Sequence, residues 1–241
     1  MVRFGFGLLL VALGASVARG NVVTTVSGTS LVVTGDGGPN AVSIERAADG
    51  VRVIGLDGTL VDGSGEGVTI AGIQRLTVKL GKGADYLALR GLDLSDGIDL
   101  RLGRGDDSVV LDDVHASSAR VRSGPGDDAV YVFHSSRFDR LSVQTSSGHD
   151  LIVVDGAWVF DDLDVDSGSG DDDVTIVATR VDDDVHLHLG SDDDFAVLAD
   201  VDIDDDAELD GEDGDDALVF SGDVWIGDDL DVDGFDDDWW W

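Results

Sequence analysis

A short turn motif that ends in Asp recurs at a nearly constant interval along most of this chain. The motif Asp residues are Asp85, Asp107, Asp128, Asp150, Asp172, Asp194 and Asp216. Subtracting neighbouring numbers gives steps of 22, 21, 22, 22, 22 and 22 residues. So regular a period indicates that each interval is one structural unit, and that the units stack on one another.

Apolar residues hold fixed positions relative to each motif Asp. One pair lies two and four residues after it: Leu87/Leu89, Val109/Leu111, Val130/Val132, Ile152/Val154, Val174/Ile176, Ala196/Leu198 and Leu218/Phe220. A second pair precedes the next motif: Leu76/Val78, Ile98/Leu100, Ala119/Val121, Leu141/Val143, Leu163/Val165, Val185/Leu187 and Ala207/Leu209. Since alternate residues of a strand point to the same side, each pair predicts a strand with one inward-facing side. A shorter apolar position between the pairs indicates a third strand or a bend, at Leu92, Val114, Ala157, Val181 and Val201.

This order of strands and turns predicts an all-β fold, a right-handed parallel β-helix with about 22 residues per coil. No segment shows a helical period. A single coil exposes its strand edges and its apolar side, so stacking must supply both the hydrogen bonds and the core. The two prolines, Pro39 and Pro125, fall in turns, which leaves the strand positions free to donate hydrogen bonds.

The repeat divides the rest of the chain into two segments. Regular coils are expected over residues 76–241, and an N-terminal cap with degenerate coils over 21–75. Within the cap, Asn40 takes the place of the motif Asp, and residues 51–70 are expected to form a degenerate coil before the regular ones. Near the other end, Asp238 lies 22 residues after the last motif Asp, which indicates a further turn.

Residues 1–20 have the three parts of a secretory signal peptide. Arg3 precedes an apolar run from Phe4 to Leu13, and the small residues Ala18 and Gly20 offer cleavage sites. The alternative, a membrane anchor, is less favoured because the apolar run is short for a bilayer. The chain has no Cys, which excludes a disulfide framework. We therefore expect a secreted or cell-surface protein with no membrane span after signal removal.

The charge of the chain restricts its partners. Its 51 acidic and 15 basic residues give a net charge of -36, which excludes nucleic acid as a natural partner because phosphates would be repelled. Cations are the natural counterpart. Adaptation to high salt is the alternative, since Lys occurs only at Lys79 and Lys82, but the Asp residues are phased with the repeat instead of scattered.

The motif itself suggests calcium. Glycine permits positive φ angles that aim backbone carbonyls to one side, and stacked turns can supply the six or more oxygens that calcium takes. The segment Gly103-Arg-Gly-Asp-Asp107-Ser-Val109 resembles the calcium-binding β-roll repeats of the repeats-in-toxin (hemolysin-type) family, with nonapeptide Gly-Gly-x-Gly-x-Asp-x-(apolar)-x. The resemblance implies calcium ligands at the carboxylates of Asp85, Asp107, Asp128, Asp150, Asp172, Asp194 and Asp216, and at carbonyls near Gly103, Gly105, Gly124, Gly126, Gly168 and Gly170.

Two departures limit this resemblance. The first Gly of the nonapeptide is replaced by Leu102, Ser123 or Ser167, and the motif occurs once per coil instead of every nine residues. Only one full row of calcium ions is therefore expected. The alternative is that the motif Asp residues cap backbone amides in tight corners without a metal.

A second set of Asp residues recurs in the later coils: Asp161-Asp162, Asp182-Asp-Asp184, Asp204-Asp-Asp206 and Asp228-Asp229. These runs should stack at another corner, where like charges on neighbouring strands repel unless cations intervene. Between Asp161 and Trp241 the only Lys or Arg is Arg180. We therefore expect the C-terminal half to fold poorly without divalent cations.

Two further groups of residues each allow two interpretations. His186 and His188 point outward from one strand between acidic neighbours, which suits either a transition metal or ordinary ion pairs. Arg101, Arg120 and Arg122 lie on the kind of outer face where β-helical polysaccharide lyases carry a catalytic base. They also suit ordinary pairing with acidic residues across the strands, and no long loop interrupts the coils to build a cleft.

The pattern predicts an exported, calcium-stabilised structural or adhesive module of the cell surface or extracellular matrix, without catalytic activity. Over residues 31–238 it resembles repeat regions of large secreted bacterial surface proteins. Its expected partners are calcium ions, with cell-envelope polysaccharide or self-association through coil ends as further possibilities. The alternative function is a calcium-dependent polysaccharide lyase or polysaccharide-binding β-helix.

Overall fold

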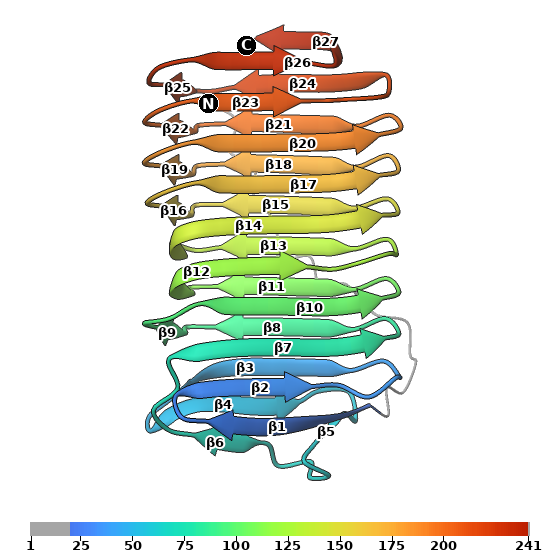
Figure 1. Ribbon diagram of the computed structural model, residues 1–241, viewed down its shortest axis with the longest axis vertical. Coiled ribbons are helices and arrows are strands. Elements are labelled where there is room, and N and C mark those ends of the chain that lie inside the picture. The colour runs from blue at the N-terminus through green and yellow to red at the C-terminus, as the bar shows by residue number, and fades with distance from the viewer. Residues whose placement is uncertain (1–19, 241) are drawn as a thin grey trace.

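Strand pairing in the computed structural model, which describes residues 20–240, follows the repeat of the motif Asp. Each strand of a coil pairs in parallel with its equivalent in the next coil, as Leu87 does with Val109 and Val109 with Val130. The result is a parallel β-solenoid of about seven turns, all-β over the described residues, with about 22 residues per turn (Figure 1). The fold class predicted from the sequence is confirmed.

Each coil has three sides. The first carries the long strands β2 (Ser30–Thr34), β7 (Arg75–Lys82), β10 (Ile98–Arg104), β12 (His115–Arg122), β14 (Arg137–Ser147), β17 (Leu163–Ser169), β20 (Val185–Ser191), β23 (Ala207–Asp210) and β26 (Leu230–Asp233). The second carries β3 (Ala41–Ala47), β8 (Tyr86–Arg90), β11 (Ser108–Asp112), β13 (Ala129–Phe133), β15 (Leu151–Asp155), β18 (Asp173–Val177), β21 (Phe195–Ala199), β24 (Asp216–Ser221) and β27 (Phe235–Trp240). The third is short: β9 (Asp93–Leu94), β16 (Trp158–Val159), β19 (Arg180–Val181), β22 (Asp202–Ile203) and β25 (Trp225–Ile226), joined by the first residues of β12 and β14.

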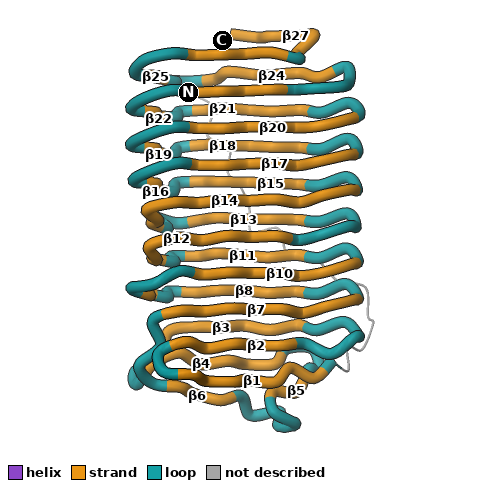
Figure 2. The backbone as a smooth tube through the Cα atoms, viewed as in Figure 1, coloured by secondary structure: helices purple, strands orange, loops and turns teal. Residues whose placement is uncertain are grey.

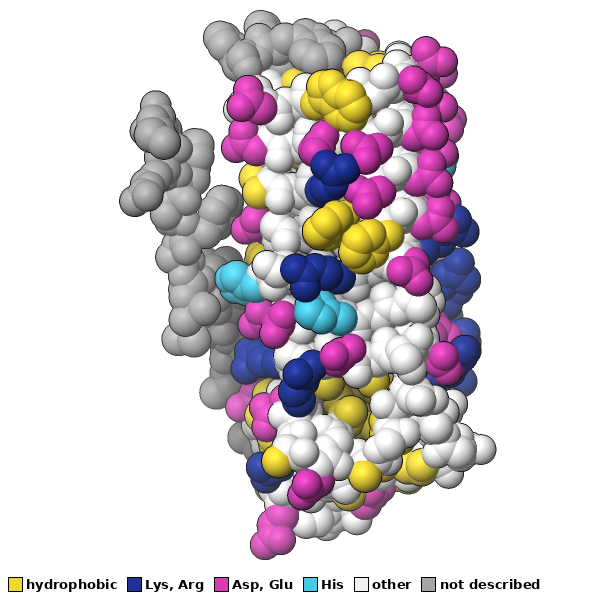
Figure 3. Space-filling model, turned by 90° about the vertical axis from the view of Figure 1, so that its left-hand side faces the viewer, with side chains coloured by type: hydrophobic (Ala, Val, Ile, Leu, Met, Phe, Trp, Pro, Cys, Tyr) yellow, Lys and Arg dark blue, Asp and Glu magenta, His cyan; other side chains and the backbone are white. Residues whose placement is uncertain are grey.

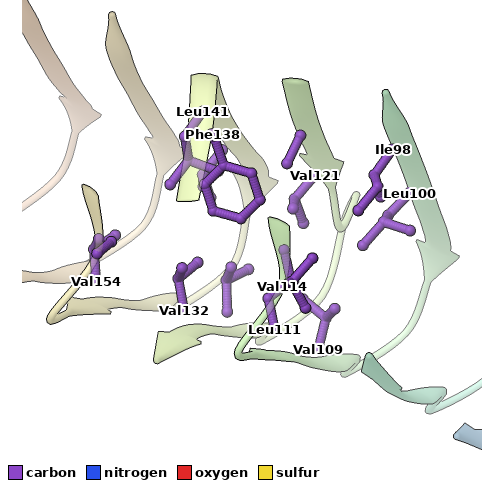
Figure 4. Close-up of a cluster of buried hydrophobic side chains, with 14 of the residues drawn as sticks. Ile98, Leu100, Val109, Leu111, Val114, Val121, Val132, Phe138, Leu141 and Val154 are labelled. Atoms are coloured by element: carbon purple, nitrogen blue, oxygen red, sulfur yellow. The ribbon is translucent and has the colours of Figure 1, made fainter. Parts of the chain in front are cut away.

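The core runs along the solenoid as columns of equivalent residues. Both predicted apolar pairs point inward and are buried, and Figure 4 shows Val132 facing Leu141 and Phe138 from the opposite side. The predicted shorter position resolves into two buried columns on the third side: Leu92, Val114, Ser136, Ala157, Thr179 and Val201, and Leu94, Ala116, Phe138, Val159, Val181 and Ile203. Burial of these side chains supplies the main stabilisation, about 25 cal/mol per Å² of apolar surface removed from water.

A further inward column explains why the nonapeptide's first Gly is absent here. Leu102, Ser123 and Ser167 are fully buried, as are Leu80, Thr145 and Leu189 at the equivalent positions. Two of the three buried hydroxyls donate along the stack, Thr145 to the Ser167 carbonyl at 2.6 Å and Ser167 to the Leu189 carbonyl at 2.8 Å, whereas Ser123 Oγ has no hydrogen-bond partner among the described residues. These residues continue the strand as core positions, and the turn begins one residue later.

The N-terminal region differs from its prediction in one respect. The coil of Asn40 lies directly against the coil of Asp85, because β2 pairs with β7 and β3 with β8. The degenerate coil expected at residues 51–70 is therefore not part of the stack. Instead β4 (Gly50–Gly55) folds back antiparallel on β3, and β6 (Val68–Ile70) pairs antiparallel with β4. With β1 (Asn21–Ser27) and β5 (Leu60–Val61) they cover the end of the solenoid (Figure 2).

The turn predicted at Asp238 is also wrong. The turn between β26 and β27 is short: Asp210 pairs with Asp233 and Asp216 with Phe235, so two steps along the chain replace six, and Leu218 pairs with Asp238. Asp238 therefore lies within β27 and not at a motif corner. A constant step along the sequence cannot anticipate this shorter turn, and the register shift between Asp216 and Ala217 restores only one residue of the difference. The predicted signal peptide, apart from Gly20, lies outside the described residues.

Close stacking of the motif turns should make their glycines irreplaceable. Gly126 has a φ of 141°, and an added Cβ would lie 2.2 Å from the Gly105 carbonyl oxygen. We expect Gly126→Ala to lower the free energy of unfolding by more than about 2 kcal/mol, through backbone strain and displacement of the neighbouring coil. Gly65→Ala, where an added Cβ meets nothing within 4 Å, should change it by less than about 0.5 kcal/mol. Urea denaturation measures both, and equal values would contradict the stacking.

Candidate metal sites at the acidic corners

The seven motif Asp residues form an inner row at the corner between the first and second sides. Each has only 1–3 % of its surface exposed. Its Oδ1 accepts a hydrogen bond from the backbone N–H of the equivalent residue one coil earlier, at 2.6 to 2.8 Å. The row begins at Asn40, whose N–H donates to Asp85. Every motif carboxyl thus ties its own coil to the preceding one.

The other oxygen of each motif carboxyl has no such partner. Oδ2 of Asp85, Asp107, Asp128, Asp150, Asp172, Asp194 and Asp216 is buried without a hydrogen bond to any described residue. A buried carboxylate oxygen without a donor is costly, so it favours either a proton on the carboxyl or a cation beside it. The donor set is oxygen-only and matches the chemistry of calcium, and one free oxygen per coil fits a single row of ions.

Burial is the main cause of raised pKa values along the inner row. It raises the pKa of Asp107 to about 8 and that of Asp194 to about 7, with further contributions from the negative charges of neighbouring coils. The pKa values of Asp85, Asp128 and Asp172 rise to about 6. Those of Asp150 and Asp216 are raised as well, again mainly by burial. Asp85, Asp107, Asp128, Asp172 and Asp194, with pKa values of about 6 to about 8, therefore exchange protons near neutral pH.

A second, outer row accompanies the inner one at the same corner. The residue before each motif Asp is exposed. In four coils it is an Asp whose carboxylate accepts a backbone N–H from the following coil: Asp106 from Asp127 at 3.2 Å, Asp127 from His149 at 3.0 Å, Asp171 from Asp193 at 3.3 Å and Asp193 from Asp215 at 3.1 Å. The inner row bonds to the preceding coil and the outer row to the following one. The doubled Asp is visible in the sequence, as at Asp106-Asp107, but its spacing alone does not predict that the two carboxylates bond to opposite neighbouring coils.

The glycines named with the calcium prediction lie in these turns. Gly103, Gly105, Gly124, Gly126, Gly168 and Gly170 all have φ between 106° and 141°. Their coils are linked through the backbone, since Gly103 donates to the Ser123 carbonyl and Gly105 to the Pro125 carbonyl. The structure thus brings the predicted carboxylates and glycines together at one corner, and coordination of calcium by them stays a prediction.

The later Asp runs stack at the corner between the third and first sides, as predicted. Three groups have ligand oxygens within 4.8 Å of one another: Asp161, Asp162 and Asp183; Asp183, Asp184 and Asp205; Asp205, Asp206 and Asp228. Figure 3 shows acidic side chains gathered over the upper, C-terminal coils. Since successive groups share Asp183 and Asp205, they form one continuous acidic column.

Two arginines lie near this acidic column. Arg140 pairs with Asp161 at 3.0 Å and with Asp162, and Arg180 contacts Asp182, Asp202 and Asp204, each at 2.6 Å. Neither ion pair includes Asp183, Asp205 or Asp206. The middle of the acidic column thus has no basic side chain paired to it among the described residues.

The outer face of the long strands has a shallow hollow of about 570 Å³, lined in part by Arg120, Arg122 and Gln144. Arg101 and Arg122 pair with Asp99 at 2.8 and 3.1 Å, which is the ordinary pairing considered from the sequence. Arg120 has no ion pair among the described residues. His186 and His188 border the hollow as well, at the side of the acidic coils.

Comparisons of the chain with protein-family models, curated proteins and solved structures yield no match. Residues 20–240 contain no helix of the length and apolarity needed to cross a bilayer.

The raised pKa values predict that stability without divalent cations falls as pH rises from about 4 to about 8. Unfolding lowers the pKa of Asp107 from about 8 to 3.8, so between these values the folded chain holds a proton that the unfolded chain has lost. The stabilisation is complete below pH 4 and is lost as pH rises through 8. Urea denaturation in chelator at pH 5 and pH 8 should show the decline.

Asp107→Asn should reduce this decline, because the amide cannot ionise and Asn40 shows that Asn fits the same place. The loss of stability between pH 5 and pH 8 should therefore be smaller in the variant than in the wild type. Asp49→Asn, at an exposed position whose carboxylate is not among the groups that raise the pKa of Asp107, is the control and should keep the wild-type dependence of stability on pH. If stability depends on pH in Asp107→Asn as it does in the wild type, the raised pKa of Asp107 is not the cause of the decline.

Proposed function

We propose that this protein is an exported, non-catalytic β-solenoid that calcium stabilises, and that it serves as a structural or adhesive module of the cell surface or extracellular matrix. The observation that carries the proposal is the continuous acidic column of Asp161, Asp162, Asp183, Asp184, Asp205, Asp206 and Asp228. These carboxylates repel one another and have few basic partners, so a bound cation is needed to make their close approach favourable.

The carboxylates of the acidic column repel one another. Neighbouring coils lie about 4.8 Å apart, and like charges at that distance repel by about 1 kcal/mol or more even at a solvated surface. Carboxylate oxygens within 4.8 Å of one another match the ligands of calcium, and two or three carboxylates offset its charge. The unpartnered inner oxygens at the opposite corner of the long strands offer a second row of the same chemistry.

The surface role rests on shape and on the N-terminal pattern. Stacked coils give long, regular faces of the kind that repeat proteins use for extended binding surfaces. Residues 1–20 have the composition of a signal peptide, and extracellular calcium is commonly abundant enough to fill weak oxygen sites. Together these features support a stiff module displayed outside the cell, in contact with envelope polysaccharide or with other copies of itself.

Calcium should raise the melting temperature of the full chain. Ions bound only by the folded state stabilise it by about 2.7 kcal/mol at a hundredfold excess over Kd, which corresponds to on the order of 5–10 °C for a chain of this length. Circular dichroism melts in chelator and then in calcium measure the change. An unchanged strand signal and melting temperature would refute the proposal.

Neutralising the acidic column should remove most of this response. Asp183→Asn with Asp205→Asn interrupts all three Asp groups and relieves repulsion, so the double variant should melt higher in chelator and gain less than half the wild-type increment from calcium. Asp49→Asn with Asp57→Asn, an equal charge change at exposed N-terminal positions, is the matched control and should keep the full increment.

A polysaccharide lyase or polysaccharide-binding module is the second candidate, and the hollow beside the free Arg120 is the observation that favours it. Incubation with polyuronates should give no unsaturated product if the first proposal holds. Product formation by the wild type that disappears in Arg120→Ala with Arg122→Ala would replace the first proposal with the second.

A further inference from the structure

Glu212 departs from the repeat at a place where the fold itself favours glycine. The equivalent positions in other coils include Gly81, Gly103, Gly168 and Gly190, all with positive φ. Glu212 has a φ of 67°, a left-handed conformation that side-chain-bearing residues adopt at a cost. Since Gly would satisfy the turn without strain, the side chain of Glu212 calls for an explanation in what it contacts.

The side chain of Glu212 lies beside His188 and Asp210. Its Oε1 is 3.9 Å from His188 Nδ1, and one ligand atom from each of the three residues lies within 4.8 Å of the other two. The backbone N–H of Glu212 donates to Asp210 Oδ1 at 2.9 Å, which fixes that carboxylate and leaves Oδ2 available. An oriented carboxylate of this kind is typical of metal sites, where a second hydrogen bond holds the ligand in place.

The parallel register builds the surroundings of this cluster. His188 lies directly between Asp166 on β17 and Asp210 on β23, and His186 lies two residues earlier on the same outward side of β20. His186 Nδ1 is buried without a hydrogen bond to any described residue, 3.3 Å from Asp164 Oδ1. Two of the five histidines of the chain therefore meet carboxylates on this one strand.

We propose that His188, Asp210 and Glu212 bind a divalent transition metal ion of the zinc class. One imidazole and two carboxylates give three protein ligands, a number that leaves a coordination position for water. Imidazole nitrogen distinguishes this cluster from the Asp-only groups of the acidic column, because nitrogen suits zinc, nickel and copper whereas carboxylate and carbonyl oxygens suit calcium and magnesium. The site is independent of the calcium proposal.

The test uses zinc added to the full-length chain in excess calcium, so that oxygen-only groups are occupied. Calorimetry should show one zinc ion per chain, and cobalt in its place should give a visible absorption band typical of mixed nitrogen and oxygen ligands. His188→Ala and Glu212→Gly should each weaken zinc binding by more than about tenfold. Glu212→Gly restores the residue that the repeat favours, so its urea midpoint should equal or exceed the wild-type value and binding is tested in a folded chain.

The control is His149→Ala. His149 Nδ1 lies 3.9 Å from Asp171 Oδ2, a histidine–carboxylate pair like that of His188 and Glu212, but it belongs to no group of three ligands among the described residues. Zinc affinity should be unchanged in this variant. Absence of zinc binding in calcium, equal binding in Glu212→Gly and wild type, or an equal loss in His149→Ala would each overturn the site.

Discussion

The hydrogen bond from a backbone N–H to the motif Asp of the next coil is the contact on which the solenoid's regularity depends. It occurs at every step from Asn40 to Asp216 and places one carboxyl per coil inside the corner. Because the bond joins equivalent residues, it holds each corner in register with the next. The bond from Asn40 to Asp85 forms across an interval of 45 residues, so the extra residues of that interval leave the stack as an antiparallel extension and the corner is kept.

The same hydrogen bond holds a row of carboxyls in a buried corner, where their negative charge is not compensated. Each inner carboxyl has one oxygen satisfied by an amide and another with no donor, and its nearest charged neighbours are further carboxyls. Protons and calcium are alternative solutions to this problem, since either removes the uncompensated charge. The outer row and the acidic column also stack carboxylates on neighbouring coils, but they lie at the surface, where water weakens the repulsion between the charges. Under the proposed function, folding of this chain is linked to the cations and protons around it.

The sequence predicted the fold because the repeat exposes which residues share a column. Val109 and Leu111 were identified as inward-facing from their spacing alone, and both are fully buried. The placement of residues 51–70 could not be predicted, because a 45-residue interval fits two stacked coils as well as one coil with an antiparallel extension. The choice depends on contacts between strands that are distant along the chain.

The candidate sites, like the fold, could be predicted from the sequence only in part. The pattern located the motif Asp residues and the later Asp runs, and it raised amide capping as the alternative to calcium, but it could not reveal that Oδ1 accepts an amide of the neighbouring coil while Oδ2 has no donor among the described residues. That distinction depends on the orientation of a carboxyl against the neighbouring coil, which the residue type does not determine. Glu212 stands four residues before the last motif Asp, and its approach to His188 brings together residues of different coils, which the spacing alone does not predict.

Departures from the repeat are therefore the most informative residues on this surface. Inward columns tolerate only apolar or small hydroxyl side chains, because they must pack against their equivalents above and below. Outward columns are free of that constraint: one of them reads Asp93, His115, Arg137, Trp158, Arg180, Asp202 and Trp225 along the third side. At an outward position such as that of Trp225, which is 53 % exposed, solvent accommodates the change of type. Glu212 differs because five equivalent positions carry Gly with positive φ, and its own left-handed turn places its carboxylate 3.9 Å from His188 Nδ1. The proposed metal site would offset the strain of that turn, which Gly avoids.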